Sequence, residues 1–120
     1  MRFLLKVSIP VEAGNRAVRE GTLGETVSKI LSDLKPEAAY FTEEEGKRTG
    51  FLIVKLESAQ QIPSVAEPWF LAFNAGVEFH PVMVPEDLQK AGSDIARAAT
   101  TYGQTNEDAV IINSRSLGKS

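Results

Sequence analysis

Residues 38–57, AAYFTEEEGKRTGFLIVKLE, decide the fold of this chain. Two runs rich in aromatic and β-branched residues, AAYFTEE and TGFLIVKLE, are joined through EEGKR, and Gly46 suits a tight turn. The stretch therefore predicts a β-hairpin. A segment of helical periodicity lies on each side of it, and a further strand lies beyond each of those segments. The hairpin is thus the centre of a β-α-β-β-α-β order.

On the N-terminal side, MRFLLKVSIP predicts a strand whose residues alternate between two faces. The apolar face carries Phe3, Leu5, Val7 and Ile9. A helical stripe follows, made of Leu23, Val27, Ile30, Leu31 and Leu34. The helix begins at the capping box TLGE, residues 22–25, or Gly21 and Gly24 interrupt a longer helix that begins near Ala13. Both alternatives end at Lys35-Pro36.

On the C-terminal side, apolar residues at helical spacing predict an amphipathic helix. They are Ile62, Val65, Ala66, Trp69, Phe70 and Phe73. Pro63 suits its first turn, Pro68 predicts a kink or a delayed start, and Gly76 is expected near its C-cap. VEFHPVMV predicts a fourth strand, at a sheet edge because Pro81 lacks an N–H. Residues 85–102 predict a last helix, with a stripe of Leu88, Ala91, Ile95, Ala98, Ala99 and Tyr102.

The predicted fold class is α+β: a ferredoxin-like βαββαβ domain plus a C-terminal helix, over residues 1–102, with the first strand beside the fourth. Residues 103–120 are polar apart from AVII, and we expect a mobile tail or an arm onto a partner chain. Helices cover one face of such a sheet. The other face is expected to carry Leu4, Lys6, Ser8, Tyr40, Thr42, Phe51, Ile53, Lys55, Glu78, His80 and Val82. That face is half apolar, which predicts a homodimer whose two sheets form an α/β barrel.

Composition narrows the classes of function. The chain has 120 residues, of which 42% are hydrophobic and 24% charged, as in one soluble domain. Its net charge of −3 comes from scattered residues, so we expect no nucleic-acid partner. The chain has no cysteine, which excludes thiolate catalysis and Cys-based metal sites. Lys6 breaks the first apolar run and no run is long enough for a membrane span, so we expect a cytoplasmic protein without a membrane partner.

The first candidate site lies on the uncovered sheet face. Pairing the first and fourth strands at their midpoints places His80 opposite Lys6 and Glu78 opposite Ser8. His80, the only histidine, is then a candidate acid/base catalyst for a small carbonyl compound, with Lys6 and Glu78 as orienting groups. The alternative is a structural Lys6–Glu78 ion pair with His80 packed neutral beside it. A single histidine without cysteine predicts no metal site, unless two copies of His80 meet across a dimer axis, and we expect no cofactor.

The second candidate site is the space between the sheet and the helices. Trp69, Phe70, Phe73 and Phe79 are predicted to line a pocket there, and ordinary core packing is the alternative. Tyr40 is a candidate proton donor if it faces a cavity, and an interface residue if it does not. Tyr40, Trp69 and Phe73 are therefore the candidate ligand-binding residues.

The order of elements, the first strand MRFLLKVSIP and the final strand followed by a helix resemble the dimeric α/β barrel superfamily. That superfamily includes muconolactone isomerases and cofactor-independent antibiotic-biosynthesis monooxygenases. LKVSIPVEAGN, KPEAAYF, EGKRTGF, EPWFLAFNAGVEF and PVMVPEDLQKAG more closely resemble a set of small uncharacterised bacterial proteins, over about residues 1–102. The resemblance implies the fold and the homodimer, and an aromatic substrate between sheet and helices in monooxygenase-type members.

We therefore expect a homodimeric barrel that binds a small molecule. The alternative is a cofactor-independent isomerase or monooxygenase that acts on a small aromatic or carbonyl metabolite, with His80 as acid/base.

Overall fold

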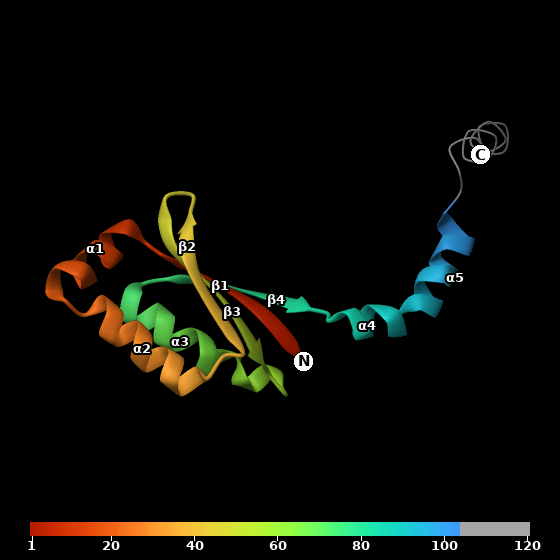
Figure 1. Ribbon diagram of the computed structural model, residues 1–120, viewed down its shortest axis with the longest axis horizontal. Helices are drawn as coiled ribbons and strands as arrows, with labels where there is room; N and C mark the ends of the chain where they lie inside the picture. The colour runs from red at the N-terminus through yellow and green to blue at the C-terminus, as the bar shows by residue number, and fades with distance from the viewer. Residues whose placement is uncertain (104–120) are drawn as a thin grey trace. The chain divides into compact units, whose positions relative to one another are not determined.

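The computed structural model describes residues 1–103, and the chain divides into two compact units, Met1–Val82 and Met83–Ser120. The first unit contains β1 (Arg2–Ile9), α1 (Val11–Glu20), α2 (Leu23–Leu34), β2 (Ala38–Glu44), β3 (Lys47–Lys55), the 3₁₀ turn η1 (Ala59–Gln61), α3 (Ile62–Phe73) and β4 (Gly76–Val82) (Figure 1). The second contains α4 (Pro85–Lys90) and α5 (Gly92–Tyr102). The predicted α+β class is confirmed. The tail predicted over residues 103–120 lies, from residue 104 onward, outside the described residues.

The four strands form one antiparallel sheet in the order β2-β3-β1-β4. The predicted position of the first strand beside the fourth is confirmed, and Pro81 lies in an edge strand as predicted. The pairing of β1 with β3 places the residues on the two faces of the sheet as predicted. Leu5 is opposite Leu52 on one face, and Lys6 is opposite Phe51 on the other. We call the face that carries Lys6 and Phe51 the open face.

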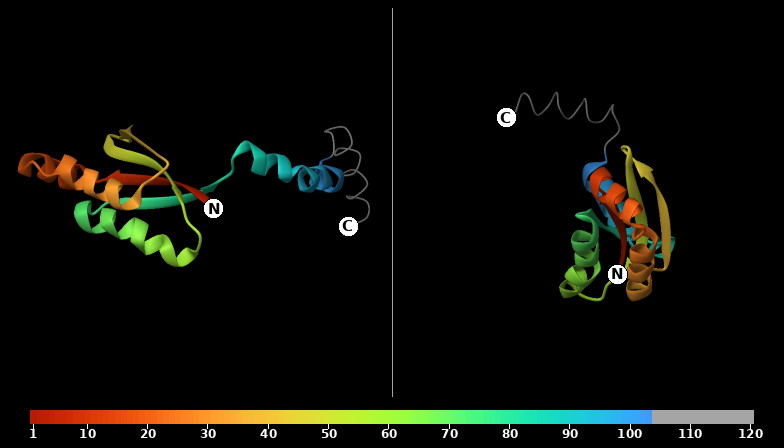
Figure 2. Two further views of the ribbon diagram at one scale, coloured as in Figure 1. Left: turned by 60° about the horizontal axis from the view of Figure 1, so that its bottom comes forward. Right: turned by 90° about the vertical axis from the view of Figure 1, so that its left-hand side faces the viewer.

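The helices α1, α2 and α3 pack on the face opposite the open face (Figure 2). The core there includes Leu5 and Val7 from β1, Ile30 from α2, and Trp69 and Phe73 from α3. Trp69 is 0% exposed and is the largest fully buried side chain. Burial of each large apolar side chain contributes roughly 1.5–3 kcal/mol, so this face holds the main stabilising contacts of the unit.

The chain between β1 and β2 forms two helices, which supports the interrupted version of the two open alternatives. The first helix begins at Val11 and ends at Gly21, whose φ of 73° is the left-handed conformation that glycine adopts without a steric penalty. The second helix begins immediately afterwards at Leu23, so Gly24 lies inside its first turn. The interruption therefore falls at Gly21 and Thr22, and Gly24 does not take part in it.

The third helix begins one residue before Pro63 and continues through Pro68, so the prediction of a delayed start at Pro68 is wrong. Its C-cap is Asn74, with a φ of 54°, and Gly76 is instead the first residue of β4. Asparagine is the other residue that enters the left-handed region readily, and here it takes the role predicted for the glycine.

The single helix predicted over residues 85–102 is wrong. Two helices, α4 and α5, meet at Ala91, because Gly92 follows directly and weakens a continuous helix at that point. The predicted apolar stripe is exposed at Leu88, Ile95 and Tyr102, and no described residue of α4 or α5 is buried. Within residues 1–103, no helix has the length and apolar character needed to cross a membrane.

Candidate functional site

A row of ionisable side chains crosses the open face. The Glu78 carboxylate lies between both of its predicted partners: Oε1 is 3.2 Å from His80 Nε2, and Oε2 is 3.9 Å from Lys6 Nζ. Lys6 Nζ also lies 2.7 Å from Oε2 of Glu44, at the hairpin end of β2. The side chains of Glu78 and His80 are about half exposed. The three predicted residues are therefore brought together, with Glu78 as the group that joins the other two.

The register between β1 and β4 differs from the prediction by two residues. Lys6 is opposite Glu78, and Leu4 is opposite His80. Ser8 has a glycine opposite it and stays outside the row. A shift of two residues keeps every side chain on its own face, so the alternating pattern that predicts the faces does not determine this register.

Glu44 is the member of this row that sequence reasoning missed. Its hydrogen bond to Lys6 is the main cause that raises the pKa of the Lys6 ammonium above the ordinary 10.5. Burial of Lys6 lowers the pKa, whereas the negative charges of Glu44, Glu78 and Glu45 raise it further. Lys6 is thus a permanent cation near neutral pH and orients the carboxylates rather than accepting protons. The signal was present, because Glu44 has the same strand parity as Tyr40 and Thr42.

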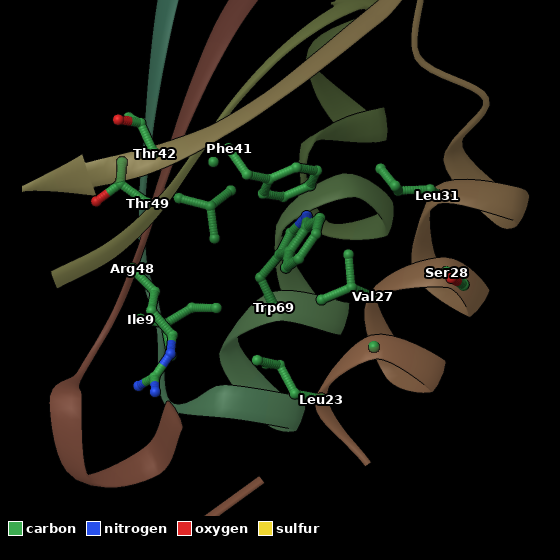
Figure 3. A pocket seen from close by; sticks show the side chains of 13 residues that line it. Ile9, Leu23, Val27, Ser28, Leu31, Phe41, Thr42, Arg48, Thr49 and Trp69 are labelled. Carbon is green, nitrogen blue, oxygen red and sulfur yellow. The ribbon is translucent and has the colours of Figure 1, made fainter. Parts of the chain in front are cut away.

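A cavity of about 600 Å³ lies on the helix side of the sheet, within the roughly 300–1,000 Å³ typical of small-molecule sites (Figure 3). Its wall is drawn from β1, α2, β2, β3 and α3. It is lined by Val7, Ile9, Leu23, Gly24, Val27, Ser28, Leu31, Phe41, Thr42, Arg48, Thr49, Gly50 and Trp69. Most of these side chains are apolar. We call this space the hairpin pocket, because the β2–β3 hairpin forms one side of it.

Phe41 lies beside Trp69 in the hairpin pocket because of a glycine on the neighbouring strand. Phe41 and Gly50 are cross-strand partners, and a Cβ added at Gly50 would lie 3.0 Å from Phe41 Cε1. The missing side chain gives the phenyl ring room to lie against β3. Phe41 is more than half exposed, so its ring forms an outer wall of the pocket while the indole of Trp69 forms the inner wall.

The indole nitrogen of Trp69 is the unusual polar group of this pocket. Nε1 is buried and has no hydrogen-bond partner among the described residues. An indole N–H can only donate, and a buried donor without an acceptor costs roughly 1–3 kcal/mol. Figure 3 shows the nitrogen on the edge of the indole that is turned toward the Phe41 ring. Because this atom is shielded in the structure, an acceptor on a molecule in the pocket would satisfy the donor only after neighbouring side chains moved aside.

The two remaining predicted ligand-binding residues lie elsewhere. Tyr40 is on the open face, paired with Phe51, and is 69% exposed. Phe73 is buried in the core, with its ring centroid 6.3 Å from that of Trp69, and it does not line the hairpin pocket. Phe79 packs edge-to-face against Phe3. Only Trp69 of the predicted aromatic set lines the cavity, and Phe41 was missed although its alternation with Tyr40 indicates the helix side.

Within residues 1–103, no group of three His, Asp or Glu side chains is placed to hold a metal ion. The chain matches no model of a protein family, and no curated relative is found for it. The candidate function therefore depends on the two sites themselves.

Proposed function

We propose that this protein is a small-molecule-binding homodimer of the ferredoxin-like α/β barrel type, and that the hairpin pocket is its binding site. The observation that carries the proposal is the buried, unpartnered Trp69 Nε1 in the wall of an apolar cavity of about 600 Å³. Binding pockets of this size commonly combine apolar walls with a few polar groups that fix orientation. The ligand class is an apolar, drug-fragment-sized molecule that carries an oxygen acceptor.

The homodimer is supported by the open face. The βαββαβ order and the sheet order β2-β3-β1-β4 agree with a ferredoxin-like arrangement, in which helices cover one face only. The open face of the described unit carries Phe51 and Ile53 at its centre and Tyr40 at its β2 side. A second copy, related by a two-fold axis, would cover this surface with an identical one.

The binding test uses the fact that Trp69 is the only tryptophan of the chain. A ¹⁵N-labelled sample has a single tryptophan indole N–H signal, which is expected to move downfield and saturate when an apolar fragment with an oxygen acceptor enters the pocket. Val27→Phe narrows the pocket and should abolish the shift. Val18→Phe, on the exposed surface of α1, is the matched control and should leave it unchanged. Equal shifts in both variants would place the fragment elsewhere and refute the proposal.

A second candidate function is favoured by the contacts of Glu78 with His80 and Lys6. In this proposal the protein is a cofactor-independent isomerase or monooxygenase of a small aromatic or carbonyl compound, with His80 as acid/base. His80→Ala should then slow turnover of a compound bound on the open face by about 10²–10⁴-fold, measured as isomerisation by NMR or as oxygen uptake. Turnover that is indifferent to His80→Ala contradicts this candidate and leaves the binding proposal intact.

A further inference from the structure

The charges that line the hairpin pocket indicate which molecules it selects. Of the thirteen lining residues, Arg48 alone is charged, and none is acidic. The chain as a whole has a net charge of −3, so this local positive character does not reflect the average surface. A cation in an otherwise uncharged wall favours a ligand of opposite charge.

The guanidinium of Arg48 retains unused hydrogen-bonding capacity. Nη1 donates to Asn15 Oδ1 at 3.1 Å, which is a neutral acceptor, and no carboxylate lies within ion-pair distance among the described residues. Its cross-strand neighbour is Glu43, whose Oε2 instead accepts the backbone N–H of Gly46 at 3.1 Å. A guanidinium has five donors arranged as a fork that fits a carboxylate, so Arg48 can bind an external one without losing an internal partner.

A glycine in α1 makes room for this group. A Cβ added at Gly14 would lie 2.5 Å from Arg48 Nη1, so the side chain lies directly against the helix backbone. Figure 3 shows the guanidinium beyond Ile9 and turned away from Phe41. The polar end of the pocket, at Arg48, is therefore separate from the aromatic part formed by Trp69 and Phe41.

We propose that the hairpin pocket selects apolar monocarboxylates, aromatic or medium-chain aliphatic, whose carboxylate binds Arg48 while the apolar body packs against Trp69 and Phe41. This inference rests on the proposed binding function and adds the charge of the ligand. Arg48 is then the residue that determines specificity, and Asn15 and Gly14 hold it in place.

The test compares matched pairs of carboxylate and uncharged amide: 4-hydroxybenzoate with 4-hydroxybenzamide, 2-naphthoate with 2-naphthamide, and decanoate with decanamide. Kd is measured from the Trp69 indole N–H signal during titration of the full chain. We expect each carboxylate that binds to do so about tenfold or more tightly than its amide, because a charge-assisted hydrogen bond to a guanidinium exceeds a neutral one.

Variants of Arg48 identify the group responsible. Arg48→Gln should reduce carboxylate affinity to that of the amide and leave amide affinity unchanged, while Arg48→Lys should restore part of the difference. Arg19→Gln, on the exposed surface of α1, is the control for net charge and should have no effect. Gly14→Ala keeps the charge but displaces the guanidinium, and should weaken the carboxylates selectively.

The outcomes separate the two proposals. Amides that bind as tightly as carboxylates, or an Arg48→Gln variant that weakens both equally, would overturn the charge selection while the pocket remains a binding site. No movement of the indole signal with any of the compounds at millimolar concentration would overturn the pocket and the charge selection together.

Discussion

At the scale of single residues, Trp69 is both the centre of the core and the wall of the pocket. Its side chain is 0% exposed, yet its Nε1 donor has no acceptor among the described residues. Apolar burial favours the folded state by several kcal/mol, and the unpaired donor opposes it by roughly 1–3 kcal/mol. The large apolar contribution exceeds the polar cost, so the residue is buried although its donor is unpaired.

Trp69→Ala is expected to lower the free energy of unfolding by about 3–5 kcal/mol, because it removes a large buried side chain and leaves a cavity. Leu71→Ala in the same helix is the control: this leucine is 79% exposed, so the change should stay within about 0.5 kcal/mol. Urea unfolding followed by circular dichroism measures both variants. Similar small losses for the two would mean that Trp69 does not support the core.

Lys6 gives the open face a defined pH dependence. Its pKa is raised in the folded protein, chiefly by the hydrogen bond to Glu44. The contribution of this Lys6–Glu44 interaction to the stability of the folded protein is therefore fully present below the ordinary pKa of 10.5. It is lost as the pH rises through the higher pKa of the folded state. The ¹³Cε shift of Lys6 measures the pKa directly, and Glu44→Gln should lower it. A pKa unchanged by that substitution would contradict the assigned cause.

The two sites differ in how far their residues could be predicted. The row of Lys6, Glu78 and His80 could be predicted from the alternation of side chains along β1 and β4. That alternation is enough to show that all three residues lie on the same face of the sheet. The hairpin pocket did not, because it depends on how closely α2 packs to the hairpin and on the ring of Phe41 lying over Gly50. Such distances between elements have no periodic signal in a sequence.

At the scale of elements, the β2–β3 turn is the most specific local structure. Glu45 and Gly46 have φ values of 54° and 77°, so both central residues are left-handed, as a two-residue hairpin turn of type I′ requires. Glutamate is unfavourable at such a position, whereas Asn-Gly is the preferred pair. The turn therefore forms although Glu45 is not a preferred residue at its position.

Glu45→Asn is expected to raise the unfolding free energy by about 0.5 kcal/mol, and Gly46→Ala to lower it by about 1–2 kcal/mol, because a Cβ is strained at positive φ. Gly92→Ala, at the first residue of α5, is the control: this glycine has open space around it, so the change should stay within about 0.5 kcal/mol. Thermal unfolding of the three variants checks the signs. A neutral Gly46→Ala would show that the turn tolerates another conformation.

The boundaries of the helices and strands could be predicted only in part from local sequence signals. The hairpin and the first strand were predicted correctly because their turn residue and alternation agree. The end of α3 was misplaced because Asn74 and Gly76 both suit a C-cap, and only tertiary packing decides between them. The break at Ala91 was missed because the spacing of the apolar residues continues across it. Gly92 weakens the helical backbone at this point without changing that spacing.

At the scale of the whole molecule, the open face is the surface that a second copy is proposed to cover. The full chain is expected to have the mass of a dimer by light scattering. Tyr40→Asp places a charge on this face at a residue that is 69% exposed, and should shift the mass toward the monomer. Leu71→Asp, on α3, is the matched control and should remain dimeric. A monomeric wild-type chain would refute the homodimer.

The sheet order also has a consequence for the way the chain is made. The strand β1 lies between β3 and β4, yet it is synthesised before both of them, and β4 is the last of the four strands in residues 1–103 to be synthesised. Until residue 82 has left the ribosome, β1 can pair on one side only, and its other edge exposes unpaired backbone groups. Nascent chains on neighbouring ribosomes can pair through that edge, so slow translation between β3 and β4 would favour aggregation over a correctly closed sheet.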